Sequence, residues 1–285
     1  MSGFPSSSHP TSSLPVHVIA PAGGVLPVRL SEIWEYRELV YFLVWREIKI
    51  RYKQTALGAA WAVLQPLLAM TVFTLFFGRL AGLPSDGLPY SVFTFCALLP
   101  WQLFAFALTE SSNSVVANQR LITKVYFPRL ILPLAGVCVG IADFAFTFVL
   151  LLAMLAYYGL TPGWAMLTVP LWTVLALATA LGVGIWFSAI NVRYRDVRYT
   201  LPFLTQIWLI ATPVAYSSSI VPEAWRPVVA LNPMVGVVDG FRWALLGTAS
   251  FPGPTVLVSS LAVLVLLVSG LFYFRSVERT FADIV

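Results

Sequence analysis

The stretch Asn118-Gln-Arg-Leu-Ile-Thr-Lys-Val-Tyr-Phe-Pro-Arg-Leu-Ile-Leu-Pro133 separates two long apolar runs and carries three cations, Arg120, Lys124 and Arg129. Basic residues between apolar spans are typical of loops on the cytoplasmic side of a membrane. Two prolines interrupt the stretch, and proline both lacks an N–H and disfavours the helical region for the residue before it. The pattern predicts a short surface helix, then a break, then a new membrane helix that begins near Arg129.

The composition around this stretch is that of an integral membrane protein. Apolar residues make up 59% of the 285 residues and charged residues only 10%, whereas a soluble domain has about 25% charged residues. Only helices and closed barrels satisfy the backbone within lipid, and the apolar runs here have the length of helices. The sequence therefore predicts an all-α membrane protein with a single membrane domain.

Six apolar runs are candidates for transmembrane helices. The fifth is short and carries Pro202, Gln206 and Pro213, so we expect a kinked helix that faces protein or water. Residues 217–254 are apolar but broken by prolines, which predicts two short re-entrant helices on the outer side rather than a full crossing. The six predicted spans are 57–80, 91–113, 130–158, 166–190, 200–216 and 255–274.

The region before the first span has two parts. Residues 1–30 are rich in Ser, Pro and Gly and almost uncharged, which predicts a disordered tail that stays in the cytoplasm. Residues 31–55 place Ile33, Tyr36 and Val40 on one side of a helix and charged residues opposite, at 100° per residue. We expect an amphipathic helix in the membrane interface there, followed by the transmembrane domain over residues 56–285.

The distribution of positive charge predicts the orientation. Of the 17 Lys and Arg residues, all but three lie before the first span, in 118–129, in 193–198 or after the last span. The exceptions are Arg79, Arg226 and Arg242. This bias indicates a multi-pass protein of the cytoplasmic membrane with both termini in the cytoplasm. The net charge of +5 is then an orientation signal, and no nucleic-acid partner is expected.

The chain lacks the residue patterns of common catalytic and metal sites. Both histidines, His9 and His17, lie in the tail, so no catalytic triad and no histidine metal cluster can be assembled in the spans. No G-x-x-x-x-G-K-[ST] phosphate loop occurs either. We therefore expect no enzyme activity, catalytic residue, cofactor or metal in this chain. If ATP drives the protein, a partner subunit binds the ATP and Mg.

Asp143 lies in the middle of an apolar run, and Glu110 lies near the end of another. A charge at the bilayer midplane costs about 2.5–3.5 kcal/mol on insertion scales, so Asp143 needs a partner, a proton or water. Asp143 is either a packing contact or the coupling site of a proton-driven carrier. Gly136 and Gly140, four residues apart, predict a close helix contact.

Aromatic side chains within or at the ends of the spans are candidates for a wall along which sugars slide without binding tightly, as a polymer conduit requires. Ordinary core and interface positions explain the same pattern. The candidates are Trp61, Phe73, Phe76, Phe77, Trp101, Phe104, Trp208 and Tyr216.

Three ordered motifs give the chain a family resemblance. They are Lys124-Val-Tyr-Phe-Pro-Arg129 with Ile131-Leu-Pro133, Asn191-Val-Arg-Tyr-Arg-Asp-Val-Arg198, and Leu231-Asn-Pro-Met234 with Phe241-Arg242. Together they resemble the ABC-2 type permeases, the membrane subunits of ABC transporters that export O-antigen, capsule and teichoic acid chains. The resemblance covers residues 32–274 and implies a homodimer that works with two cytoplasmic ABC ATPase subunits on a lipid-linked polysaccharide, within membrane lipid.

The resemblance also implies roles for particular residues. Tyr126 and Phe127 would anchor a coupling helix in the ATPase, and the region from Pro222 to Gly247 would close the outer mouth. Cations of the gate helix over residues 33–53 would meet the pyrophosphate of a polyprenyl-linked glycan. The coupling helix comprises Thr123, Lys124, Val125, Tyr126, Phe127, Pro128 and Arg129. The gate-helix cations are Arg46, Lys49, Arg51 and Lys53, and the second cytoplasmic loop contains Arg193, Arg195, Asp196 and Arg198.

Two other functions are compatible with the sequence. One keeps the fold but carries a drug or small lipid, against which the interfacial helix and the aromatic spans argue. The other is an ion-coupled secondary carrier that uses Asp143.

Overall fold

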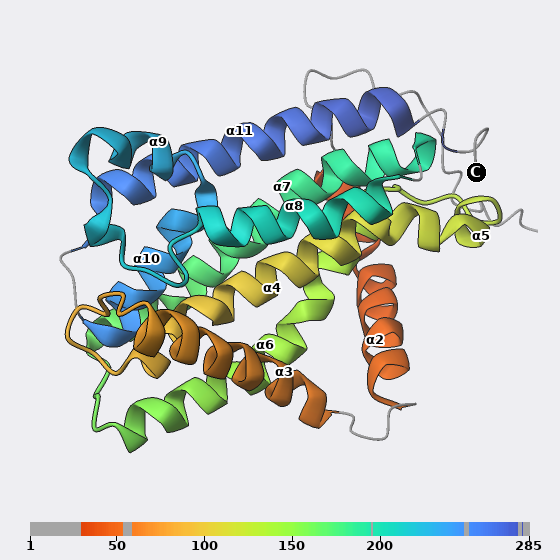
Figure 1. Ribbon diagram of the computed structural model, residues 1–285. Helices are drawn as coiled ribbons and strands as arrows, with labels where there is room; N and C mark the ends of the chain where they lie inside the picture. The colour runs from red at the N-terminus through yellow and green to blue at the C-terminus, as the bar shows by residue number, and fades with distance from the viewer. Residues whose placement is uncertain (1–29, 54–58, 195, 248–250, 279–280, 282–285) are drawn as a thin grey trace, which may run out of the picture.

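The computed structural model describes residues 30–53, 59–194, 196–247, 251–278 and 281, and every regular element among them is helical. The predicted all-α fold is thereby confirmed. The predicted tail lies outside the described residues except for Leu30, which begins α1 (Leu30–Glu35). A second helix, α2 (Arg37–Lys53), follows and runs crosswise to the long helices in Figure 1.

The remaining elements form a bundle of long helices with short helices at its ends (Figure 1). Helix α3 (Ala59–Phe73) continues as the π-helix η1 (Thr74–Leu80), and η2 (Trp164–Thr168) leads directly into α7 (Val169–Arg193). The other long helices are α4 (Tyr90–Ala117), α6 (Ile131–Tyr157), α8 (Val197–Ala211), α10 (Pro233–Leu246) and α11 (Gly253–Glu278). The short ones are α5 (Gln119–Ile122), η3 (Ser218–Ile220), η4 (Glu223–Trp225) and α9 (Arg226–Ala230).

Five helical segments are long and apolar enough to cross a membrane, and a sixth is reached if one bent pair counts as a span. The bent pair, Glu223–Ala230 with Pro233–Leu246, turns by 107° where the sequence predicts two short helices. Helix α8 corresponds to the predicted fifth span but has 15 residues, about 22 Å, which is shorter than a hydrocarbon core of about 30 Å. It contains Pro202 in its first half. It ends at Ala211, two residues before Pro213, because the residue before a proline is disfavoured in the helical region.

Helix α4 is the centre of the bundle and lies against α6, α7 and α10. In its most apolar stretch 78% of the residues are buried, compared with 6% for Ala60–Leu80 and 17% for α11. Since α4 is apolar on all sides, only an interior position buries its whole surface. Helices α3 and α11 instead present broad apolar faces to the outside of the chain.

The contact between α4 and α6 depends on glycine. A Cβ atom on Gly136 would lie 3.0 Å from the backbone of Glu110 and Ser111, and one on Gly140 would lie 2.9 Å from the ring of Phe106. The two helices therefore approach too closely for a larger residue at Gly136, and the predicted glycine-mediated contact is confirmed.

The bundle has two chemically different ends. Helices α1, α2 and α5 and the C-terminal end of α11 lie at one end, which we call the α2 end, whereas α9 and the loop before α4 lie at the other (Figure 1). Of the described cations, those of α2, the stretch 118–130, Arg193, Arg198 and Arg275 lie at the α2 end. The sequence-based grouping of positive charge thus corresponds to one end of the molecule.

At the opposite end, Arg242 is buried. Its guanidinium donates to the backbone oxygens of Val214 (3.0 Å) and Tyr216 (3.1 Å) and lies 3.7 Å from the centroid of the Phe93 ring. These contacts hold the turn after α8 against α10 and α4. The sequence analysis used Arg242 as a charge on the outer side and as part of the third motif. It missed this packing role, because nothing local in the sequence indicates the burial of a single arginine.

Candidate functional site

The loop between α4 and α6, residues 118–130, is the candidate site, and we call it the α5 loop. Asn118 ends α4 by donating from its side-chain amide to Ser114 O at 2.8 Å. Helix α5 then makes a single turn, and Pro128 O accepts from Ile131 N at 3.1 Å where α6 begins. The α5 loop therefore projects from the α2 end between two long helices.

The predicted helix over residues 123–129 is wrong. The helical turn covers Gln119–Ile122, and residues 123–130 form turns and extended chain. The residue before Pro128 is disfavoured in the helical region, and the inward position of Phe127 adds a tertiary constraint. The predicted start of the next membrane helix near Arg129 agrees with the observed start at Ile131.

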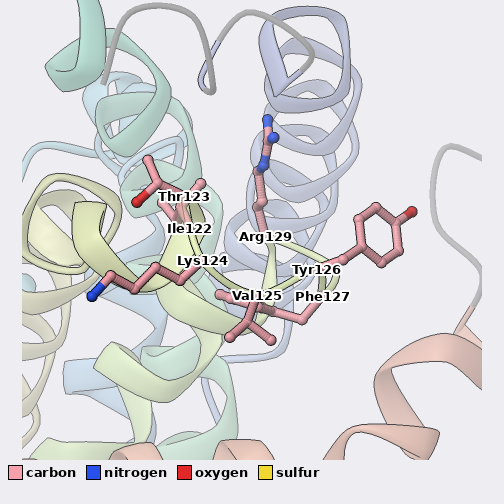
Figure 2. A pocket seen from close by; sticks show the side chains of 7 residues that line it. All are labelled: Ile122, Thr123, Lys124, Val125, Tyr126, Phe127 and Arg129. Carbon is pink, nitrogen blue, oxygen red and sulfur yellow. The ribbon is translucent and has the colours of Figure 1, made fainter.

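Tyr126 and Phe127 are neighbours in the sequence but face opposite environments. The Tyr126 side chain is 74% exposed and Val125 is 53% exposed, whereas Phe127 is only 4% exposed. Figure 2 shows Tyr126 and Lys124 extending in different directions away from the loop. The prediction that Phe127 is a surface anchor is therefore wrong, and Tyr126 is the exposed large aromatic of this loop.

Phe127 belongs to a hydrophobic cluster that joins five elements to the α5 loop. Because such a cluster is close-packed, a displacement of the loop is transmitted to the helix ends around it. We call it the loop cluster; its buried members are Leu43, Val115, Ile122, Phe127, Ile131, Leu132, Ala135, Ile185, Ala189, Val192, Phe274 and Phe281.

The α5 loop also encloses a shallow pocket of about 230 Å³ (Figure 2). Its lining includes exposed Thr123 and Lys124 and half-buried Arg129. The Arg129 backbone N–H lies 3.4 Å from Glu278 Oε1, and its guanidinium donates to Glu278 O at the end of α11. Arg129 is thus held within this chain, whereas Arg120 and Lys124 are the exposed cations of the loop.

The gate-helix cations divide into two groups. Arg46 Nη2 contacts Glu47 Oε1 at 2.5 Å and Asn118 Oδ1 at 2.8 Å, which connects α2 to the α5 loop. Lys49 and Lys53 are exposed, and the Lys49 amine lies 5.2 Å from the centroid of the Trp45 ring. Two of the four predicted phosphate-binding cations are therefore oriented outward.

Arg51 pairs with Asp143 of α6 at 2.7 Å, and the Tyr52 hydroxyl donates to the same carboxylate. Partial burial, together with the hydrogen bond and the negative charge of Asp143, raises the pKa of Tyr52 above its ordinary value. The phenol therefore stays protonated and donates. Asp143 has the partner that its place in an apolar helix requires.

Apolar side chains of α2 lie on more than one side of the helix. Leu43 is buried against the bundle, whereas Tyr41, Phe42 and Trp45 are exposed. The apolar face of α2 is therefore incomplete, and the location of α2 in a membrane interface stays a prediction.

The second predicted loop is shorter than expected, because Arg193 ends α7 and Arg198 lies in the first turn of α8. The Arg193 guanidinium lies 5.5 Å from the centroid of the Tyr194 ring. Asp196 is the residue before α8, and its backbone oxygen accepts from Tyr199 N (3.0 Å) and Thr200 N (3.1 Å). Arg198 is exposed, and Arg195 lies outside the described residues.

The predicted channel aromatics do not share one surface. Trp101 and Phe104 are buried inside the chain, so the prediction that they line a conduit is wrong. They fill the core because α4 is the central helix. Trp208 contacts Phe104 at 4.9 Å between ring centroids and donates to Asn232 Oδ1 at 2.8 Å. The exposed members are Trp61, Phe76 and Phe77, whereas Phe73, Trp208 and Tyr216 are half-buried.

Helix α8 carries an exposed apolar face that the sequence analysis missed. Phe203, Ile207 and Ile210 follow helical spacing along it and are exposed. Beside them, a groove of about 400 Å³ lies between α8, α7 and α4. The spacing of these three residues is the signal that would have identified this face.

The sequence is similar to known proteins along most of its length. Residues 38–246 match the ABC-2 type transporter family. The chain is 32% identical over 257 residues to the O-antigen export system permease protein RfbA of Myxococcus xanthus, covering 89% of this chain and 98% of that protein. It is 29% identical to the protein of the same name from Klebsiella pneumoniae (87% and 95% covered). Identity to the polysialic acid transport protein KpsM of Escherichia coli is 22% (82% and 91% covered).

Proposed function

Since the chain belongs to the ABC-2 type transporter family, we propose that it is the channel-forming subunit of an ATP-driven exporter. Its cargo is a polyprenyl-pyrophosphate-linked polysaccharide such as O-antigen, which it moves outward across the cytoplasmic membrane. The similarity over nearly full length to O-antigen export permeases carries this proposal. The five to six candidate spans provide a helical domain of the required kind.

The exporter contains two copies of this chain and two separate ABC ATPase subunits. The sequence has no phosphate-loop motif, so ATP and Mg are bound by the ATPases. The α2 end, with its excess of Lys and Arg, faces the cytoplasm together with both termini. This orientation places the α5 loop where a cytoplasmic ATPase reaches it.

The α5 loop is the docking element for the ATPase. Tyr126 and Val125 are its exposed apolar side chains, and Lys124 extends from the loop in a different direction from Tyr126. Exposed tyrosines are enriched among interface hot spots. The cleft that receives the loop should combine an apolar pocket for Tyr126 with acidic residues opposite Lys124 and Arg120.

Movement of the docked loop reaches the spans through two connections. The first is the loop cluster around Phe127, which includes residues of α2, α4, α6, α7 and α11. The second is the hydrogen bond from Arg46 to Asn118, which joins α2 to the α5 loop. ATP-driven closure of the ATPases therefore displaces the gate helix and several spans together.

The cargo meets exposed side chains of this chain. Lys49 and Lys53 on α2 bind the pyrophosphate, since their amines are oriented outward while Arg46 contacts Glu47 and Asn118. The exposed aromatics of α3 and η1, Trp61, Phe76 and Phe77, provide a surface for sugar rings. The apolar face of α8 completes the wall or contacts the second copy.

An ATPase-binding experiment tests the docking role. The full-length permease in lipid nanodiscs is titrated with its partner ATPase, and both affinity and ATP turnover are measured. Tyr126→Ala should weaken binding about tenfold or more, as expected for a hot spot, and should reduce permease-stimulated turnover. Tyr157→Ala is the matched control, because Tyr157 is exposed at the opposite end of α6. Equal affinity for wild type and Tyr126→Ala would contradict the docking role.

A further inference from the structure

The end of α11 is attached to the α5 loop through Arg129. The guanidinium of Arg129 donates to Glu278 O, and the Arg129 backbone N–H donates to Glu278 Oε1 at 3.4 Å. The Glu278 carboxylate also lies 3.6 Å from the guanidinium of Arg275, one turn earlier in α11. Arg129 of the α5 loop is thus connected to Glu278, which lies 149 positions further along the sequence.

Phe281 extends this attachment beyond the helix. Its side chain is fully buried, with its ring centroid 5.3 Å from that of Phe274 and 5.9 Å from the guanidinium carbon of Arg129. Phe281 belongs to the loop cluster that also contains Phe127 and Ile122. An aromatic ring near the chain end therefore closes the cluster on which the α5 loop rests.

The conformation of the α5 loop depends on such side-chain contacts. Within the described part of the chain, Tyr126 and Phe127 make no backbone–backbone hydrogen bond, although Val125 N donates to Leu121 O at 3.0 Å. The backbone alone does not fix the direction of the Tyr126 side chain. What fixes it is the burial of Phe127 on one side and the attachment of Arg129 to α11 on the other.

We propose that Glu278 and Phe281 form a C-terminal clasp that holds the α5 loop in the conformation that binds the ATPase. The proposal rests on the docking role given to this loop above. Arg129, Glu278 and Phe281 are positioning residues that preorganise Tyr126, so that ATPase binding does not have to order the loop. Loss of the clasp should leave the spans folded but make the α5 loop mobile.

The first measurement is amide hydrogen exchange across residues 122–130 in the full-length permease without ATPase. Phe281→Ala should increase exchange of these amides about tenfold, because opening of the loop no longer disrupts a packed ring. Phe281→Leu should largely restore the protection. Phe272→Ala is the control, because Phe272 lies in the last part of α11 and is exposed, and it should leave exchange unchanged.

The second measurement is the affinity of the same variants for the ATPase. Phe281→Ala should weaken binding about tenfold, while Phe281→Leu binds nearly as wild type. Arg129→Lys provides an independent test, since a lysine keeps the charge but lacks the planar guanidinium that reaches the Glu278 carbonyl and covers Phe281. Like Phe281→Ala, the Arg129→Lys variant should increase amide hydrogen exchange in the α5 loop.

Unchanged exchange over residues 122–130 in both Phe281→Ala and Arg129→Lys would overturn the clasp. Faster exchange spread over all the spans would also overturn it, because Phe281 would then support the whole fold. If the Tyr126→Ala variant binds the ATPase as tightly as wild type does, the docking role fails. The exchange result still decides whether the clasp exists, since it requires no ATPase.

Discussion

At the scale of single residues, Tyr126 and Phe127 are adjacent aromatics that lie in different environments. Both resemble anchors in the sequence, yet one is exposed and the other is buried in the loop cluster. Tyr126 is accessible on the surface, and Phe127 connects the α5 loop to the helix ends. Under the proposed docking role, transmission of movement from the ATPase to the spans needs both residues. Tyr126 would bind the ATPase, and without the packed Phe127 the loop would move without displacing the helix ends.

Asp143 is the second informative residue, because its partners decide between two functions. An ion-coupled carrier needs a carboxylate that exchanges protons during transport. Here Arg51 and Tyr52 of α2 both contact Asp143, which supports a packing role between α2 and α6. The same contacts explain how an acidic residue is tolerated in an apolar helix.

We predict that Asp143→Asn destabilises the protein by about 1–2 kcal/mol, between the values typical of exposed and buried ion pairs. Thermal unfolding in detergent measures this, and a double-mutant cycle with Arg51→Ala isolates the pair. ATP-driven export should continue in Asp143→Asn. Loss of export from a variant that still assembles with the ATPase would instead favour ion coupling.

At the scale of elements, the sequence was sufficient where physical rules act locally. Apolar length predicted the long helices, proline and glycine predicted the bent pair near α10, and Gly136 with Gly140 predicted the contact of α4 with α6. Placement of the α5 turn failed by about one turn, and Phe127, Trp101 and Phe104 were assigned to surfaces. Those outcomes depend on tertiary packing around α4, which no local pattern contains.

The contact of α4 with α6 allows a prediction at this scale. Gly136→Ala should destabilise the protein by about 1–3 kcal/mol, because its Cβ would lie 3.0 Å from the backbone of α4. Gly163→Ala is the control, since a Cβ there meets nothing within 4 Å. Thermal unfolding of the two variants in the same detergent provides the comparison. Equal unfolding temperatures would show that α6 shifts away from α4 without cost.

At the scale of the whole molecule, the α2 end combines the features that an exporter subunit needs. It holds the exposed Tyr126, for which we propose the docking role, the exposed lysines of α2 and the proposed clasp at the end of α11. The far end holds the bent helices and buried Arg242. Between the two ends, α3, α8 and α11 carry exposed apolar faces. Such faces are suited to contact with lipid, with a second copy of the chain or with the cargo.

Export by reconstituted protein tests the central claim most directly. The permease and its ATPase are placed in proteoliposomes with a polyprenyl-pyrophosphate-linked polysaccharide, and translocation is measured with ATP and without an ion gradient. We predict translocation that requires ATP and both proteins, and that falls at least tenfold with Tyr126→Ala but not with Tyr157→Ala. Translocation by the permease alone, driven by an ion gradient and insensitive to ATP, would contradict the account.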